Sequence, residues 1–172
     1  MAGSRETTQT TAIGDDEVLV AAEALFGLLH VHATVVRAID EALDEAHDTG
    51  LTGFELLLRL ARLHPDGASV RYLSDQVVVS PSRVSRVAEE FVGRGLLERA
   101  VSPHDGRLSL VRLTPAGREE LQAMEATFAD ALSTHVLSVL SREEILALGG
   151  IAHRLGAPNC GELGADPPES AA

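Results

Sequence analysis

The stretch SPSRVSRVAEEFVGRGLLERAVSPHDGRLSLVRLTPAG, residues 80–117, combines a helix, two short apolar runs and the start of another helix. Ser80 is a favourable N-cap residue, and Pro81 occupies the first helical position, where its missing N–H costs nothing. Gly95 suits the C′ position that ends a helix. Apolar residues recur at helical spacing, at positions 84, 87, 88, 91 and 92. The stretch therefore predicts an amphipathic helix from Ser80 to Arg94 that buries this face.

The outer face of the predicted helix is polar. It displays Ser82, Arg83, Ser85, Arg86, Glu89 and Glu90. The runs LLERAVS and LSLVRL that follow are typical of two short strands around the turn PHDGR. Thr114 and Pro115 then repeat the cap-and-proline signal of a helix start. We therefore expect a helix, a β-hairpin and a second helix in this order.

Long helical patterns flank this stretch on both sides. In residues 15–47, apolar positions alternate at spacings of four and three, as in a coiled-coil seam: Val18, Ala22, Leu25, Leu29, His32, Val36, Ile39 and Leu43. A second seam follows Thr114, at positions 121, 124, 128, 132, 135 and 139. Ser141 opens a last helix with a capping box to Glu144, and Gly156 ends it. Because a helix of about 30 residues is too long to be covered by a small core, we expect it to pack partly against another subunit.

Two shorter helices complete the pattern. Thr52 is expected to open one of them through a capping box with Glu55, and Pro65 stops it. The run VRYLSDQV predicts a weak short helix before the one at Ser80. The resulting order is helix, helix, short helix, helix, strand, strand, helix, helix. This order predicts a mainly α fold with a small β component (α+β), a winged helix-turn-helix.

The domain organisation follows from composition. Residues 1–14 are polar and unpatterned, and residues 157–172 are rich in Gly, Pro and acids, so both predict disordered tails. A single domain is expected over residues 15–156. Within it, residues 52–113 would form the winged lobe, and residues 15–47 and 114–156 the long helices.

Composition indicates a soluble, cytoplasmic protein. The chain has 172 residues, of which 45% are hydrophobic and 23% charged, as in an ordinary globular domain. No apolar run is expected to approach the roughly 18 residues needed to span a membrane, and the first residues lack a signal-peptide pattern. Cys160 is the only cysteine, which excludes an intrachain disulfide and a thiol cluster for structural zinc.

The charge distribution is uneven. The net charge of −12 argues against a nucleic-acid partner, because phosphate contacts need Lys or Arg. Between Ser80 and Arg118, however, the chain carries seven arginines (83, 86, 94, 99, 107, 112, 118) against four acids (89, 90, 98, 105). Positive charge is therefore concentrated in the segment that holds the predicted helix and hairpin.

This arrangement suits duplex DNA. An α-helix fits the major groove, where Arg83 or Arg86 would make bidentate contacts with guanine, each worth about 1–3 kcal/mol of discrimination. The hydroxyls of Ser80, Ser82 and Ser85, together with the free N–H groups of the helix start, suit phosphate. Arg107 at the hairpin tip would reach the adjacent backbone or the narrow minor groove.

At this point the sequence resembles the MarR family of bacterial transcription regulators. The family's wing signature, D-x-R-x5-L-T-x-x-G, is matched by Asp105, Arg107, Leu113, Thr114 and Gly117. The run SDQVVVSPSRVSRVAEEFVGRGLLER is similar to its helix-turn-helix, and the resemblance covers roughly residues 15–156. It implies that Asp105 braces Arg107, which enters the minor groove, and that the helix from Ser80 reads the major groove. We expect Glu89 and Glu90, late in that helix, to face away from the phosphates.

The resemblance also implies a function. It predicts a ligand-responsive repressor that binds a pseudo-palindromic operator as a homodimer, built from the first helix and the last two. Two alternatives stay open: a metal-sensing regulator of the same fold, and a winged-helix protein-interaction module that does not bind DNA. Arginines on a merely solvated face and an ordinary Asp-Gly hairpin turn are the structural alternatives for the same residues.

Family members often bind small aromatic acids between the dimer helices and the DNA-binding lobe. The candidates for pairing with such a carboxylate are His30, His32, Arg37, Arg59 and Arg62. His30 and His32 are about 200° apart around a helix and cannot share a metal ion, so zinc would need partners such as His135 or Glu55. We expect no metal site and no cofactor.

The sequence contains no motif typical of an enzyme or of a single-strand or RNA binder. The chain lacks G-x-S-x-G, H-E-x-x-H and a phosphate-binding glycine loop, so we expect no enzyme. With no Trp, one Tyr and four Phe, it also lacks the aromatic platform of single-strand or RNA binders.

Overall fold

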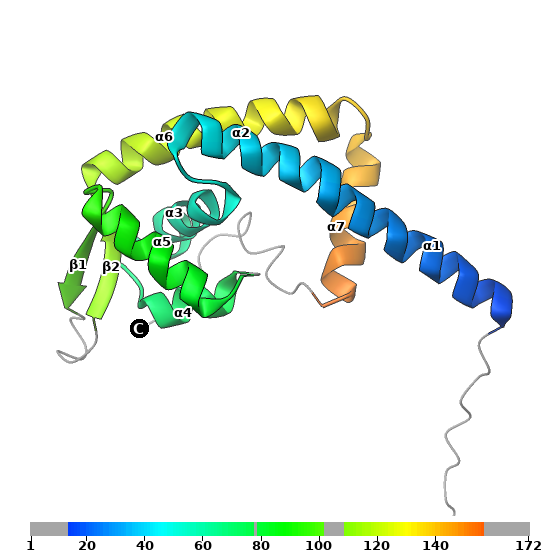
Figure 1. Cartoon of the computed structure of the whole chain (residues 1–172), viewed down its shortest axis with the longest axis horizontal. Helices are drawn as coiled ribbons and strands as arrows, with labels where there is room; N and C mark the ends of the chain where they lie inside the picture. The colour runs from blue at the N-terminus through cyan, green and yellow to red at the C-terminus, as the bar shows by residue number, and fades with distance from the viewer. Residues whose placement is uncertain (1–13, 78, 102–108, 157–172) are drawn as a thin grey trace, which may run out of the picture. The chain divides into compact units, whose positions relative to one another are not determined.

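The computed structural model describes residues 14–77, 79–101 and 109–156 (Figure 1). Its elements are α1 (Asp15–Val31), the π-helical segment η1 (His32–Val36), α2 (Arg37–His47), α3 (Leu51–Leu63), α4 (Val70–Gln76), α5 (Pro81–Gly93), β1 (Leu97–Val101), β2 (Ser109–Leu113), α6 (Pro115–Leu132), the π-helical segment η2 (Ser133–Leu137) and α7 (Arg142–Arg154). The mainly α, winged-helix architecture predicted from the sequence is confirmed. The π-helical segments were not predicted, and the tails that we expect to be disordered lie outside the described residues, apart from Gly14.

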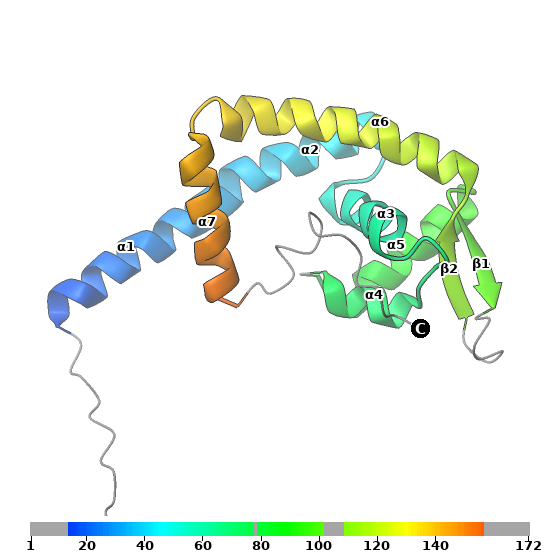
Figure 2. The same cartoon turned by 180° about the vertical axis from the view of Figure 1, so that it is seen from behind.

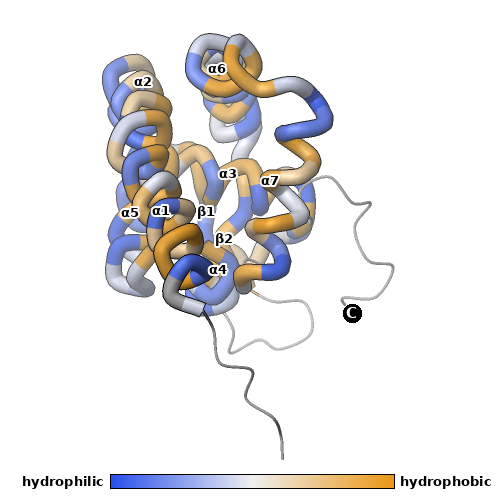
Figure 3. The backbone as a smooth tube through the Cα atoms, turned by 90° about the vertical axis from the view of Figure 1, so that its right-hand side faces the viewer, coloured by the Kyte–Doolittle hydropathy of each residue, from blue (hydrophilic) through white to orange (hydrophobic). Residues whose placement is uncertain are grey.

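The chain divides into two compact units, residues 1–37 and residues 38–172. The first unit contains α1 and η1, and most large apolar side chains of α1 are exposed: Val18, Leu19, Val20, Leu25, Phe26, Leu28, Leu29 and Val31. Figure 3 shows the corresponding hydrophobic stretches along the tube of α1. Inside the π-helical segment, the hydroxyl of Thr34 donates to the carbonyl oxygen of His30 at 2.8 Å. Such a back-bond competes with the regular helical ladder.

This helix corrects one expectation from composition. The continuous helix Asp16–His47 is long and apolar enough to cross a membrane, by length and composition only. Within residues 18–36, the only ionisable residues are Glu23, His30 and His32, and they do not offset the hydropathy of the Val, Leu and Ala residues around them. One such helix is weak evidence for a membrane span, because the buried core helix of a soluble protein and a signal sequence near the N-terminus pass the same test.

The core of the second unit is centred on α3. Leu56, Leu57 and Leu60 are almost fully buried. α3 contacts α5, α6 and β2, and α6 passes over α3 in the two opposite views of Figures 1 and 2. The rings of Phe54 on α3 and Phe128 on α6 lie 4.6 Å apart between centroids. This packing fixes α3 between the helices and the hairpin that present the candidate site.

The expected capping box at the start of α3 is wrong. The helix begins at Leu51, one residue before Thr52, and its N-cap is Gly50. Asp40 on α2 accepts the Leu51 N–H at 2.6 Å and so provides the side-chain cap from a different helix. A Cβ atom at Gly50 would collide with the Asp40 carboxylate. The helix start is therefore capped by a tertiary contact with Asp40 and not by the local capping box expected from Thr52 and Glu55.

The strands β1 and β2 form an antiparallel hairpin in which Leu97 pairs with Leu113 and Val101 with Ser109. Ala68, in the loop before α4, adds a bridge to Val111 through two backbone hydrogen bonds of 3.0 and 2.9 Å. The expected caps of the helices that follow are confirmed. The Thr114 hydroxyl accepts the Gly117 N–H, and Ser141 and Glu144 form the capping box of α7.

Candidate nucleic-acid interface

α5 has the two faces that the sequence predicts. Val84, Ala88 and Phe91 are buried against the core. The opposite side exposes Ser82, Arg83, Ser85, Arg86, Glu89 and Glu90. Gly95 adopts a left-handed conformation, with φ of +74°, directly after the C-cap Arg94. The boundaries of α5 were therefore readable from local signals alone.

The start of α5 departs from the expectation in one respect. Ser80 is the N-cap residue, but its hydroxyl makes no capping hydrogen bond. Its oxygen lies 3.1 Å from the hydroxyl oxygen of Ser82 instead. The backbone carbonyl of Ser80 accepts from the N–H groups of Arg83 and Val84, which closes the first turn. The first turn thus exposes two neighbouring hydroxyls on an uncapped helix start.

The arginines of the basic segment fall into two groups. Arg94, Arg99 and Arg112 form ion pairs with Glu90, Glu89 and Glu98, respectively. Arg83, Arg86 and Arg118 are exposed and make no hydrogen bond or ion pair with any residue that the structure describes. Arg107 and Asp105, at the tip of the hairpin, lie outside the described residues. Among the described arginines of this segment, the unpaired ones are therefore Arg83 and Arg86 in the first half of α5 and Arg118 on α6.

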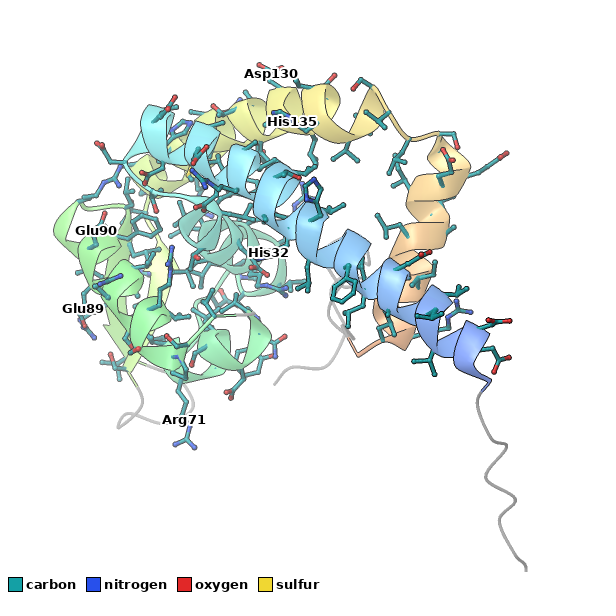
Figure 4. The ribbon with its side chains drawn as sticks, turned by 45° about the vertical axis from the view of Figure 1, so that its right-hand side comes forward. His32, Arg71, Glu89, Glu90, Asp130 and His135 are labelled. Carbon is teal, nitrogen blue, oxygen red and sulfur yellow. The ribbon has the colours of Figure 1, made fainter. Side chains whose placement is uncertain are left out.

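Glu89, on the outer face of α5, is paired with a residue of the hairpin. Its carboxylate pairs with Arg99 on β1, and the Arg112 guanidinium on β2 pairs with Glu98 at 2.7 Å. Figure 4 shows Glu89 and Glu90 on the outer side of α5. Both acids have an arginine partner, which reduces the repulsion that they would exert on an approaching phosphate.

Arg71 is a basic residue that sequence reasoning missed. It lies on α4, the helix that packs against α5, and its side chain is exposed without a polar partner in the described ranges. Figure 4 shows its side chain extending from α4 into solvent. The sequence contained a signal for this position: Ser69 is the N-cap residue of α4, and Arg71 therefore lies in the first turn of that helix.

The junction between the hairpin and α6 explains the L-T-x-x-G part of the wing signature. The Thr114 hydroxyl donates toward the carbonyl oxygens of Gly95 and Leu96, at 2.7 and 3.1 Å, and accepts from the Gly117 N–H at 3.0 Å. A Cβ atom at position 117 would collide with the Leu96 carbonyl oxygen and lie 2.8 Å from Leu113 Cδ2. These two residues therefore join the end of α5 to the start of α6.

The five candidate effector residues are divided between the two units. His30 and His32 are exposed on the first unit. Arg37 lies at the start of α2. Arg62 is exposed and pairs with Glu125 on α6 at 3.4 Å.

Arg59 differs from the other four. Only 4% of it is exposed, and Glu55 Oε1 accepts from its Nε at 3.0 Å and its Nη2 at 2.8 Å. Its buried Nη1 has no hydrogen-bond partner among the residues that the structure describes. Among the described residues, no group of three or more His, Cys, Asp and Glu side chains is placed to hold a metal ion.

The fold and this surface define a winged helix-turn-helix protein. Residues 47–108 match the model of the MarR family. An uncharacterized HTH-type transcriptional regulator of Bacillus subtilis, YdgJ, is 27% identical over 104 residues, which cover 60% of this chain and 63% of YdgJ. The similarity thus spans less than two thirds of the length of that relative.

Solved structures share the fold. Sco3205 of Streptomyces coelicolor, a MarR family transcriptional regulator in complex with DNA, is similar with a TM-score of 0.72 and 20% identity, over 88% of this chain and 92% of that one. CouR of Rhodococcus jostii RHA1, bound to p-coumaroyl-CoA, is similar with a TM-score of 0.70 and 19% identity, over 81% and 95%. Over residues 47–108 the chain is therefore similar to the MarR family, and its fold is the one that these solved structures share.

Proposed function

We propose that the protein is a sequence-specific regulator that binds double-stranded DNA through α5, as a cytoplasmic, ligand-responsive repressor. The observation that carries this proposal is the first half of α5, where Arg83 and Arg86 are exposed and unpaired within the described part of the chain. An arginine held by a neighbouring carboxylate has already satisfied its donors, whereas these two retain the planar fork that matches guanine or phosphate.

Each side chain of this surface has a role in the proposal. Arg83 and Arg86 read base edges in the major groove. Ser80, Ser82 and Ser85 donate to phosphates. Arg71 on α4 contacts the backbone beside them, and Arg107, braced by Asp105, reaches the minor groove.

The proposed assembly is a homodimer formed by the long helices. Leu25 is 55% exposed on α1, and Val139, after η2, is 74% exposed. Leu146, Leu148 and Ile151 add further exposed apolar surface on α7. Exposed apolar patches of this kind mark interaction sites in soluble proteins. Leu25→Glu and Val139→Glu should each give monomers or insoluble protein in analytical ultracentrifugation, and soluble dimers from both would contradict the assembly.

The proposed effector is a small aromatic carboxylate or its thioester, with Arg59 as its partner. A buried guanidinium N–H without an acceptor costs about 1–3 kcal/mol, and a ligand oxygen would relieve that cost. CouR is bound to p-coumaroyl-CoA, which makes aromatic acids and their CoA thioesters the first panel to test. A compound that raises the melting temperature of wild type but not of Arg59→Lys supports the role, since a ligand of the native state stabilises it. A ligand that stabilises both proteins equally would remove Arg59 from the site.

The experiment that tests DNA binding is selection of duplexes from a random-sequence library by the wild-type protein. We expect a pseudo-palindrome whose half-sites are about one helical turn apart. In gel shifts at low salt, Arg86→Ala and Arg107→Ala should bind the selected duplex more weakly than wild type. No enrichment over a shuffled duplex, or unchanged binding by both variants, would contradict the proposed function.

A further inference from the structure

The C-terminal end of α5 is attached to α2 through Arg94. Its Nη2 donates to the carbonyl oxygen of His47 at 3.0 Å, and its Nη1 lies 3.6 Å from Glu90 Oε1. His47 is the last residue of α2, so this oxygen is one of the carbonyls that a helix leaves without an intrahelical donor. It also lies at the negative end of the helix dipole, where a cation is favoured. Arg94 therefore caps α2 from the end of α5.

A single carboxylate on α6 joins the same cluster. Glu120 Oε1 lies 3.1 Å from His47 Nδ1 and 3.8 Å from Arg94 Nη2. The other ring nitrogen of His47 lies 2.9 Å from Thr127 Oγ1, also on α6. The His47 side chain is 9% exposed, which protects these contacts from solvent. The ends of α2 and α5 are thus held at one oxygen of α6.

We propose that Arg94 and Glu120 are positioning residues that fix the angle of α5 relative to α2 and α6. The inference rests on the proposed function, in which α5 reads DNA and the long helices form the dimer. α5 has 13 residues and a length of about 20 Å, so a tilt of about 10° at its anchored end moves its first turn by about 3 Å. Because a dimeric reader has a fixed distance between half-sites, a shift of this size at both first turns changes the spacing that it recognises.

Arg94 is poorly placed to be a DNA contact itself. Its side chain is 31% exposed, and it already faces the His47 carbonyl oxygen, Glu90 and Glu120. Its guanidinium also lies 5.7 Å from the centroid of the Phe91 ring, which belongs to the buried face of α5. A residue that is engaged on the protein side in this way acts on DNA through the helix that it holds.

Glu120→Gln gives the sharpest test, because its charge change alone predicts the opposite result. Removal of an acid from a DNA-binding protein should leave affinity unchanged or raise it, since repulsion of the phosphates falls. The positioning role predicts instead that Glu120→Gln binds the selected duplex about fivefold more weakly than wild type, as expected for loss of one charged hydrogen-bond acceptor. Glu125→Gln is the matched control, since Glu125 is on the same helix and pairs with Arg62 of α3 rather than with α5.

A second readout separates positioning from general stability. Glu120→Gln and Arg94→Ala should each discriminate less than wild type between the selected duplex and one with a base pair inserted between its half-sites. This ratio of affinities does not depend on the fraction of folded protein, so it remains valid for a destabilised variant.

The proposal is overturned if Glu120→Gln binds the selected duplex as tightly as Glu125→Gln does. It is also overturned if Glu120→Gln and Arg94→Ala discriminate between the two half-site spacings as well as wild type. Failure of the wild-type protein to select any duplex would instead contradict the proposed function, and this inference with it.

Discussion

The two ends of α5 differ in how they are held. At its beginning, Ser80 makes no capping bond and Arg83 and Arg86 have no partner among the described residues. At its end, Arg94 is held by α2 and α6, and Thr114 donates to the Gly95 and Leu96 carbonyl oxygens. The beginning is therefore available to a ligand, while the end fixes the helix in the domain. Counting arginines along the segment conceals this difference, because three of them are already paired with glutamates.

The largest expected effect is on the held end. Gly117→Ala should lower the free energy of unfolding by about 3 kcal/mol or more, because its Cβ atom would collide with the Leu96 backbone, which cannot move independently of the hairpin. Thermal and denaturant unfolding measure the loss. Gly93→Ala is the matched control: nothing lies within 4 Å of its Cβ position, and a helical Ala gains about 0.5–1 kcal/mol over Gly. Equal stabilities for the two variants would contradict the described junction.

At the free end, Arg86→Ala should cost about 1–3 kcal/mol of specific binding and relax the base preference at one position of each half-site. Selection from a random-sequence library by the variant protein measures the preference. Arg118→Ala removes the same charge from an exposed, unpaired arginine on α6 and should leave the base preference intact. If both variants shift the preference alike, Arg86 contributes only charge.

Alanine substitutions of Thr114 and Ser80 should affect different properties of the protein. Thr114→Ala should lower the free energy of unfolding by about 1 kcal/mol, because it removes the acceptor of the Gly117 N–H. Ser80→Ala should change stability by less than about 0.5 kcal/mol, since its hydroxyl makes no capping bond, but should weaken DNA binding. Denaturant unfolding of both variants decides the point. A larger stability loss for Ser80→Ala than for Thr114→Ala would contradict the comparison.

The smallest effect concerns α7, which provides a reference helix start away from α5. The Ser141 backbone N–H, and then its hydroxyl, lower the pKa of Glu144 below its ordinary value. Because the folded pKa is depressed, the contribution is present at neutral pH and is lost as pH falls through that pKa. Ser141→Ala should raise the Glu144 pKa toward its ordinary value, as measured by NMR titration of the carboxyl group. An unchanged pKa would show that the hydroxyl contributes nothing to it.

The elements that local signals define were predictable from sequence. The caps at Thr114 and Ser141, the end of α5 at Gly95 and the two short strands each depend on residues within a few positions. The start of α3 was not predictable in this way, because its cap is Asp40 from another helix.

The candidate site was predictable only in part. The exposed face of α5 follows from helical periodicity. The pairing of Arg99 with Glu89 depends on the hairpin lying beside α5, and the Arg94 cluster depends on the ends of α2 and α5 meeting α6 in space. Neither contact can be predicted from the number of charged residues along the chain. The wing residues Asp105 and Arg107 stay predictions.

The most direct test of the central claim compares two double variants that remove the same charge. Arg83→Ala/Arg86→Ala alters the free end of α5, and Arg99→Ala/Arg112→Ala alters arginines that are already paired with glutamates. Fluorescence anisotropy with the selected duplex should show that the first double variant binds about 30-fold more weakly or worse, from two lost base contacts. The second should lose much less affinity, because it removes no base contact and only restores the repulsion between the unpaired Glu89 carboxylate and phosphate. Equal losses, or a greater loss in the second, would contradict the claim that the first half of α5 reads DNA.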